Sequence, residues 1–372
     1  MTTTSGSWLQ QHPVLALVAV NLVLFALLAG LAELSLRLFV QHNPGYYVSV
    51  SGTDRVVEYP YGTIRINSHG FPDDEIDPHK TRRVGYFGDS VTYGVGAGYG
   101  YRVSELLERE YTEYDHLNFG GIGLSVSDAD IEYLATLASK FRLEKAIYLF
   151  NLNDILPDEV ASGDVTTVVG RVRSSKMLDA FDWLRGRSYL YAWIRNKVRN
   201  FLAAQGTGFH GYPTYEFFPA RHDDVIRQTA GRLNRFHDVL AENGTELIIV
   251  MLPYEMQISS EAEDLYAEHG IRWGSDFIAG ATQRAMDRYL DESVRRYDAL
   301  EAFSGRDGVG SSRTRHPVGK YFVYNKGDKL DWNHPTRDGH RAISEYLIGQ
   351  RILADPASED DGPAQRQTAR SE

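Results

Sequence analysis

The fold of this chain is decided by the stretch Val84-Gly85-Tyr86-Phe87-Gly88-Asp89-Ser90. A short apolar run ends there in Gly-Asp-Ser, and the glycine-rich segment 91–98 follows directly. Continuous apolar runs of this length are typical of strands that are buried on both faces, and glycine permits a tight turn and close approach by a substrate. The stretch therefore predicts a buried strand over 84–88 that carries the hydroxyl of Ser90 to a turn at the sheet edge, although Gly-Asp-Ser alone also fits an ordinary polar turn.

Four further strands are predicted, and helical patterns separate them. The strands cover 115–119, 145–150, 246–252 and about 297–303, and the helices cover 103–111, 127–141, 223–243 and 278–297. A last helix starts near Thr336. Strands that alternate with helices predict a parallel sheet in a three-layer α/β domain.

Composition excludes several classes of protein. The 372 residues are enough for one large domain or two small ones. A net charge of −11 argues against binding of nucleic acid, and the absence of cysteine excludes disulfides and thiolate chemistry. The twelve histidines form no metal-ligand pattern, and the glycines of 94–98 lack the spacing of a dinucleotide site. No metal and no cofactor are predicted.

The N-terminal segment is long and apolar enough to cross a membrane. Residues 14–32 are apolar except for Asn21, and the apolar run continues to Val40. Glu33 and Arg37 are four residues apart and can pair on one helical face. A cleaved signal peptide is the alternative, but residues 1–13 contain no Lys or Arg and the run exceeds a usual signal core. The sequence therefore favours a transmembrane anchor, and its few flanking charges do not decide the orientation.

The segments of the chain are predicted as follows. A tail over 1–13 precedes the anchor at 14–40, a lead-in with short strands covers 41–81, the α/β domain covers 82–353, and a disordered tail covers 354–372. An aromatic and basic insertion lies at about 155–222, and a glycine-rich loop over 304–320 stands in a lid-like position. Three interpretations of the insertion stay open: contact with lipid headgroups, a roof over the active site, or packing on its own domain.

A serine nucleophile needs a base, an acid that orients the base, and donors for the oxyanion. Asp331-Trp332-Asn333-His334 has a carboxylate three residues before a histidine, which can hold one ring nitrogen while the other faces outward. Asn118-Phe119-Gly120-Gly121-Ile122-Gly123 follows the second strand, and its glycines can direct backbone N–H groups inward. Asn151-Leu152-Asn153-Asp154 follows the third strand and offers a side-chain amide. Each pattern alone is common in loops.

In this order, each at a strand end, these segments resemble the sequence blocks of the SGNH (GDSL-like) hydrolase family. The resemblance covers about 82–154 and 244–350. It implies a flavodoxin-like α/β/α sandwich with five parallel strands. It also implies that Ser90 is the nucleophile and that Asp331 and His334 are the acid and the base. The oxyanion donors would be the N–H groups of Ser90 and Gly123 and the side chain of Asn153.

Three departures from the family pattern stand out. Asn151 occupies the usual position of a glycine, so the backbone conformation at this position could differ from that of the family. Val91 replaces a leucine. The insertion at 155–222 has no counterpart in a minimal domain of this family. The nucleophile elbow of α/β-hydrolases is absent because Thr92 stands where that motif needs glycine.

The lead-in and the anchor together bear on location. The lead-in reads Ile66-Asn67-Ser68-His69-Gly70-Phe71 and follows the apolar segment. This combination resembles the bacterial membrane-anchored branch of the family. The resemblance implies a single-pass protein of the cytoplasmic membrane with its catalytic domain on the periplasmic or extracellular side.

Three functions remain in competition. The leading one is a serine esterase that hydrolyses O-acyl esters, with O-acetyl favoured, on an acylated carbohydrate or another small ester. The same triad can instead transfer the acyl group to a hydroxyl of a surface polysaccharide. The third is a non-catalytic, membrane-tethered binding protein, against which the full set of site residues argues.

Overall fold

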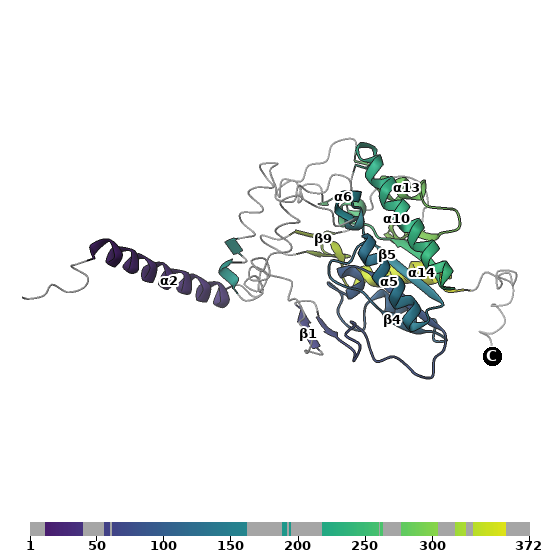
Figure 1. Cartoon of the computed structure of the whole chain (residues 1–372), viewed down its shortest axis with the longest axis horizontal. Coiled ribbons are helices and arrows are strands. Elements are labelled where there is room, and N and C mark those ends of the chain that lie inside the picture. The colour runs from purple at the N-terminus through teal and green to yellow at the C-terminus, as the bar shows by residue number, and fades with distance from the viewer. Residues whose placement is uncertain are drawn as a thin grey trace, which may run out of the picture.

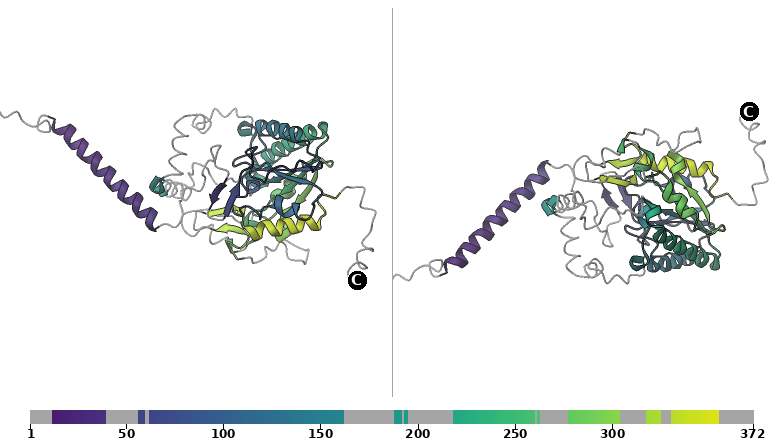
Figure 2. Two further views of the ribbon diagram at one scale, coloured as in Figure 1. Left: turned by 90° about the horizontal axis from the view of Figure 1, so that it is seen from below. Right: turned by 90° about the horizontal axis from the view of Figure 1, so that it is seen from above.

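The computed structural model describes residues 12–39, 56–59, 62–161, 188–191, 193–194, 218–259, 261–262, 277–303, 317–324 and 330–354. An apolar helix, α2 (Pro13–Phe39), extends away from an α/β domain (Figure 1). In both further views, α2 lies on the side of the domain where the short outer strands gather (Figure 2). The N-terminal apolar helix and the α/β domain predicted from the sequence are therefore both present.

A five-stranded parallel sheet forms the centre of the domain. The strands are β3 (Arg83–Gly88), β4 (Asp115–Asn118), β5 (Lys145–Phe150), β6 (Glu246–Met251) and β7 (Arg295–Asp298). Their order in the sheet is β4-β3-β5-β6-β7, so the direction of strand addition reverses between β3 and β5. Ligands of open α/β sheets bind outside the carboxyl ends of the strands at such a switch point. Ser90 follows β3 directly, so it lies at this point.

Helices cover both faces of the sheet, which confirms the predicted three-layer sandwich. On β5, Tyr148 and Phe150 pack on one face with α5 (Asp128–Phe141) and α10 (Asp223–Glu242). Ile147 and Leu149 pack on the other face with α4 (Val103–Glu108) and α14 (Arg337–Gly349). Figure 2 shows α14, in yellow, across the sheet from the teal and green helices. Because both faces are covered, the central strands β3, β5 and β6 carry continuous apolar runs rather than an alternating pattern.

Most predicted boundaries agree with the structure, and the caps explain them. The side chain of Ser127 accepts the N–H of Asp130 at the start of α5, and that of Thr336 accepts the N–H of Gly339 at the start of α14. Small polar residues at these positions satisfy N–H groups that the first helical turn leaves unpaired. The sequence alone therefore marks where these helices begin.

The fifth strand and the helix before it were predicted wrongly. The helix α13 covers only Ala281–Asp287 rather than 278–297, and β7 covers Arg295–Asp298 rather than 297–303. The apolar residues after β7 form a 3₁₀ helix, η3 (Ala299–Phe303), instead. As an edge strand with half-buried, polar side chains, β7 carries no apolar run to reveal it.

The remaining elements are short. Two antiparallel pairs flank the sheet: β1 (Val56–Tyr59) with β2 (Gly62–Arg65), and β8 (Phe322–Tyr324) with β9 (Leu330–Pro335). The short helices are α3 (Ser90–Tyr93), η1 (Leu152–Asp154), α6 (Asp158–Ala161), η2 (Pro219–Arg221) and α11 (Glu255–Ile258). Most of the predicted insertion, of the lid-like loop and of the C-terminal tail lies outside the described residues.

The helix α2 has the length and composition of a membrane span. Its segment Pro13–Leu38 is strongly apolar, with a mean hydropathy of 2.8 over its most apolar stretch, and that stretch is not buried against the protein. A core helix of a soluble domain would bury most of such a surface. Arg37 Nε lies 2.7 Å from Glu33 Oε1, so the predicted ion pair near the end of the apolar run is confirmed.

Replacing His340 with leucine is expected to reduce the acid sensitivity of folding. His340 is fully buried on α14, and its ring nitrogens have no hydrogen-bond partner among the described residues. Burial lowers the pKa of His340 to about 3, and the charges of Arg102 and His334 act in the same direction. In the unfolded chain this histidine binds a proton below about pH 6.5, whereas in the folded protein it stays neutral until the pH is much lower. The free energy of unfolding therefore falls as the pH drops from about 6.5 towards 3.

At pH 5 this histidine should cost about 2 kcal/mol of stability relative to pH 7.5. Urea unfolding of the wild type and of His340→Leu at both pH values measures the difference. His79→Leu serves as the control, because His79 is exposed and its variant should keep the pH dependence of the wild type. Parallel pH profiles of wild type and His340→Leu would contradict the prediction.

Candidate active site

The turn that carries Ser90 needs the glycine before it. Gly88 ends β3 with φ of 141°, and a Cβ there would lie 2.4 Å from Thr92 Oγ1 and 2.8 Å from the carbonyl oxygen of Leu149. Only glycine fits this conformation and this spacing. Asp89 then caps α3, since its Oδ1 accepts the N–H of Val91 at 2.8 Å. Ser90 is consequently the first residue of a tightly held helical turn and is only 7% exposed.

The strand β9 brings Asp331 and His334 to this serine. His334 Nε2 lies 2.8 Å from Ser90 Oγ, although the two residues are 244 positions apart in the sequence. On the other side of the ring, His334 Nδ1 lies 2.8 Å from both carboxylate oxygens of Asp331. The two residues stand in a strand paired with β8, whereas the sequence predicted a loop before the last helix.

The hydrogen bonds determine the tautomer of His334. Nδ1 lies against both carboxylate oxygens of Asp331, which can only accept, so it carries the proton, and Nε2 presents its lone pair to the hydroxyl of Ser90. The backbone N–H of His334 also donates to Asp331 Oδ1 at 3.2 Å, which fixes the carboxylate. Because His334 is 2% exposed, water does not compete for these bonds. This arrangement can remove a proton from the serine.

A second network surrounds Asp89, and sequence reasoning missed it. The Oδ2 atom of Asp89 accepts hydrogen bonds from Asn151 Nδ2 at 3.1 Å and from Asn153 Nδ2 at 3.2 Å. Burial raises the pKa of Asp89 above its ordinary value, while the Val91 N–H, the charge of His334 and the two amides oppose this shift. A sequence signal was available, because two asparagines follow β5 at the switch point, next to the strand β3 that ends one residue before Asp89.

The backbone at Asn151 does not require the glycine usual in the family pattern. Its φ of −88° and ψ of 144° are extended values that any residue adopts. The side chain is fully buried, donates to Asp89, and leaves its Oδ1 without a partner among the described residues. The doubt that this departure raised about the local geometry is therefore removed.

The loop after β4 is bound closely to the serine turn. The N–H of Gly121 donates to the carbonyl of Gly88 at 3.1 Å, and Asn118 Nδ2 donates to the carbonyl of Thr92 at 2.8 Å. A Cβ at Gly120 would lie 2.3 Å from the backbone nitrogen of Tyr93, so this approach also demands glycine. Gly123 follows in the same loop, exposed and with φ of 85°. Its role as an oxyanion donor remains a prediction.

Asn153 has the exposure that a substrate contact requires. Its side chain is exposed, whereas Asn151 beside it is fully buried. The Nδ2 atom of Asn153 carries two hydrogens, and the bond to Asp89 uses one of them. The other is left for a substrate oxygen, and the predicted role of Asn153 is compatible with this geometry.

Asn151→Gly is expected to lower kcat about tenfold with little change in KM. The variant removes one of the donors that hold the buried Asp89 carboxylate, and a hydrogen bond to a charged group contributes about 1.5–3 kcal/mol. Steady-state kinetics on an activated ester and thermal unfolding measure the two effects. Asn243→Gly, at an exposed asparagine, controls for the added backbone freedom. A variant with wild-type kcat and stability would show that this bond is dispensable.

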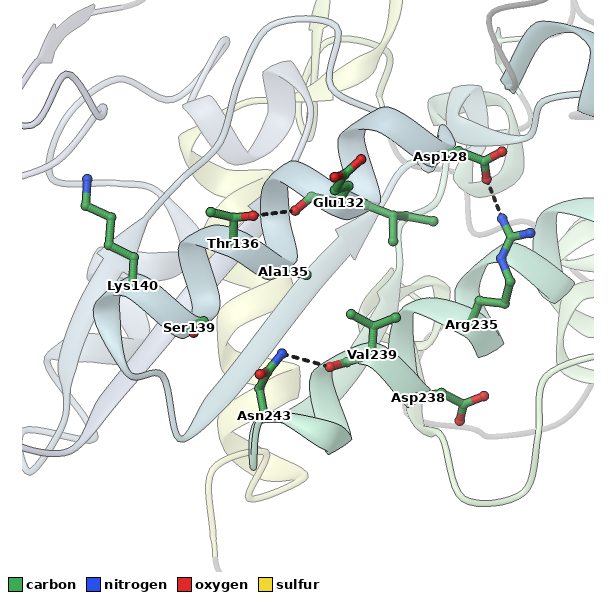
Figure 3. A pocket seen from close by; sticks show the side chains of 11 residues that line it. Asp128, Glu132, Ala135, Thr136, Ser139, Lys140, Arg235, Asp238, Val239 and Asn243 are labelled. Atoms are coloured by element: carbon green, nitrogen blue, oxygen red, sulfur yellow. Dashed lines mark hydrogen bonds and ion pairs between the residues drawn. The ribbon is translucent and has the colours of Figure 1, made fainter.

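A groove on the outer side of the domain lies apart from this site. It runs between α5 and α10, and Figure 3 shows Asp128 paired with Arg235 across it. Its lining includes Glu132, Thr136 and Val239 but none of the residues that surround Ser90. Among the described residues, no three His, Asp or Glu side chains come together as metal ligands.

Comparisons with known proteins add remote structural similarity. No family model matches the chain, and no curated protein matches it. A lipolytic protein of the G-D-S-L family from Veillonella parvula is 12% identical, covers 74% of this chain and 100% of its own, and has a TM-score of 0.36. An acetylxylan esterase from Geobacillus stearothermophilus is 13% identical, covers 72% and 94%, and has a TM-score of 0.38. Similarity at this level assigns no activity, so the function is argued from the geometry.

Proposed function

We propose that this protein is a membrane-anchored serine esterase of the SGNH type that hydrolyses O-acyl esters. One observation carries the proposal: the unbroken hydrogen-bonded chain from Ser90 Oγ through His334 to the carboxylate of Asp331. A structural hydroxyl needs no such chain. The serine also lies at the switch point of the sheet, where α/β folds bind ligands.

Acylation begins when Ser90 Oγ attacks the carbonyl carbon of the ester. Its proton passes to His334 Nε2, which lies 2.8 Å away, and Asp331 stabilises the imidazolium that results. The tetrahedral intermediate collapses as the bond to the alcohol oxygen breaks, and His334 returns the proton to that oxygen. An alcohol leaves and an acyl group remains on Ser90.

Deacylation repeats these steps with water. His334 removes a proton from the water, the hydroxide attacks the acyl carbon, and the proton returns to Ser90 Oγ as the carboxylic acid leaves. In both halves the oxyanion receives hydrogen bonds from the N–H groups of Ser90 and Gly123 and from the Asn153 amide. Each donor is expected to contribute about 10²–10³ in turnover, or about 3–4 kcal/mol.

The preferred acyl group is acetyl or another small one, on an acylated carbohydrate or a similar small ester. Ser90 and His334 are 7% and 2% exposed, and this burial of the nucleophile and the base is the support for a small acyl group. A short acyl chain needs less room beside the serine than a long one does. A series of p-nitrophenyl esters from acetate to octanoate tests this preference, and a kcat/KM that rises with chain length would overturn it.

A fluorophosphonate probe tests the proposed nucleophile directly. The full chain in detergent should gain one covalent adduct, and peptide mapping should locate it on Ser90. Prior acylation by an activated acetyl ester should slow the labelling, because both reagents need the same hydroxyl. Absence of both labelling and ester turnover would refute the catalytic assignment.

We infer the location from the apolar helix and from the resemblance of the lead-in to the membrane-anchored branch of the family. α2 spans the cytoplasmic membrane once, and the α/β domain lies on the periplasmic or extracellular side. The span is supported by the long apolar surface of Pro13–Leu38, whose most apolar stretch is not buried against the protein. The side is supported by the resemblance of the lead-in over 66–71. Because the chain contains no cysteine, a single cysteine at the exposed Tyr133 should react with an impermeant maleimide in intact cells. Labelling only after lysis would reverse the orientation.

A further inference from the structure

We propose that a short part of the insertion, which is docked on the end of α2 through residues 188–190, rests on the surface of the bilayer. The proposal assigns a lipid-facing surface within the enzyme itself, beyond the membrane helix. It rests on the proposal that α2 spans the membrane. Its described members are residues 188–191 and 193–194, here called the interfacial segment.

The side chain of Glu33 on α2 accepts hydrogen bonds from the first turn of the interfacial segment. Its carboxylate oxygens accept the hydroxyl of Ser188 at 2.9 Å, the N–H of Tyr189 at 3.0 Å and the N–H of Leu190 at 2.8 Å. The N–H groups at the start of a helical turn have no partner within the turn, and a carboxylate is their strongest acceptor. Three bonds to one side chain therefore hold a segment that is more than 150 positions away in the sequence.

Arg37 extends the contact by one helical turn. Its guanidinium lies 5.0 Å from the ring centroid of Tyr189, and its Nε lies 2.7 Å from Glu33 Oε1. Cation–π contact and ion pair together join Arg37, Glu33 and the interfacial segment into one cluster. The cluster is therefore an organised contact rather than a single hydrogen bond.

The position of this cluster along α2 puts it at the membrane boundary. From Pro13 to Ala32 the helix has no charged residue, and Glu33 and Arg37 are the first charges after that stretch. Charged side chains at the end of an apolar helix lie at the level of the lipid headgroups. A segment bound to both charges must lie at the same level.

The interfacial segment has the side chains that suit this level. Trp193 and Ile194 are 39% and 46% exposed, and Tyr189 and Tyr191 stand on the same short segment. Trp and Tyr concentrate where hydrocarbon meets headgroups, because their rings are apolar and their N–H or O–H groups need polar partners. In the sequence, Asp182 lies farther out, and the charged residues nearest to the segment on both sides are basic: Arg185, Arg187, Arg195, Lys197 and Arg199. The chain as a whole has a net charge of −11, so this local excess of positive charge is distinctive, and it favours contact with anionic lipid headgroups.

Site-specific fluorescence tests the proposal on the full chain, which has no native cysteine to remove. Trp193→Cys, Tyr133→Cys and Leu24→Cys are each labelled with a nitrobenzoxadiazole dye in vesicles of phosphatidylcholine and phosphatidylglycerol. Lipids with a nitroxide near the headgroup should quench the dye at position 193 about twofold. The dye at the exposed Tyr133 position on α5 should stay unquenched, and deep nitroxides should quench the dye at position 24.

Glu33→Ala identifies the contact responsible. It removes the acceptor of three hydrogen bonds, so quenching at position 193 should fall to the level at position 133. Quenching at 24 but not at 193, or quenching at 193 that survives Glu33→Ala, would overturn the docking. Loss of quenching at all positions would overturn the span and the docking together. Ester turnover measured on the same vesicles reports folding and the proposed function separately from lipid contact.

Discussion

Ser90→Ala is expected to lower the kcat for p-nitrophenyl acetate by about 10⁴- to 10⁶-fold. The substitution removes the atom that attacks the ester carbon and leaves His334, its partner at 2.8 Å, without an alcohol to deprotonate. Oxyanion donors and substrate binding persist in the variant, so a residual rate above that of water is expected. Stopped-flow measurement should also find that the initial burst of p-nitrophenol disappears.

The control for this prediction is Ser344→Ala. Ser344 is also buried, on α14, but its hydroxyl donates to the carbonyl of His340 within the same helix. Its loss should change stability slightly and leave kcat unchanged, and Ser90→Ala should keep the thermal unfolding midpoint of the wild type. If Ser90→Ala retained more than about a tenth of the wild-type kcat, another residue would be the nucleophile.

Asp331→Asn is expected to lower kcat by about 10³- to 10⁴-fold while the fold is preserved. The carboxylate accepts the proton of His334 Nδ1 at 2.8 Å, so Nε2 is free to act as a base. An asparagine can present an N–H to Nδ1 instead, which moves the ring proton to Nε2 and blocks transfer from Ser90. The imidazolium of the transition state also loses its counter-charge.

Because Asp331 acts on the base rather than on the ground-state substrate, kcat and kcat/KM should fall together while KM changes little. Asp338→Asn is the matched control, since Asp338 is exposed and pairs with Arg341 on the surface of α14. Steady-state kinetics of both variants at several pH values measures the difference. A decrease of less than tenfold in Asp331→Asn would mean that His334 needs no carboxylate to orient it.

The sequence by itself determined the elements that depend on local chemistry. The apolar run before Gly88 identified β3, because a strand covered on both faces must be apolar throughout. Ser127 and Thr336 marked the starts of α5 and α14, because a helix cap acts within four residues. The apolar stretch from residue 14 onward identified α2 for the same reason, since length and composition are local properties. The pattern also grouped Ser90, Asp331 and His334 through a family resemblance.

Contacts between distant segments were decided only by the tertiary structure. The order of the strands brings His334 to Ser90 and places Asn151 and Asn153 beside the buried Asp89. The contact of residues 188–190 with Glu33 likewise joins segments that are far apart in the sequence. The edge strand β7 was misplaced because its polar residues carry no periodic signal. A hydrogen bond between side chains more than 60 positions apart leaves no mark in local sequence, since its energy depends on geometry that exists only once the sheet has formed.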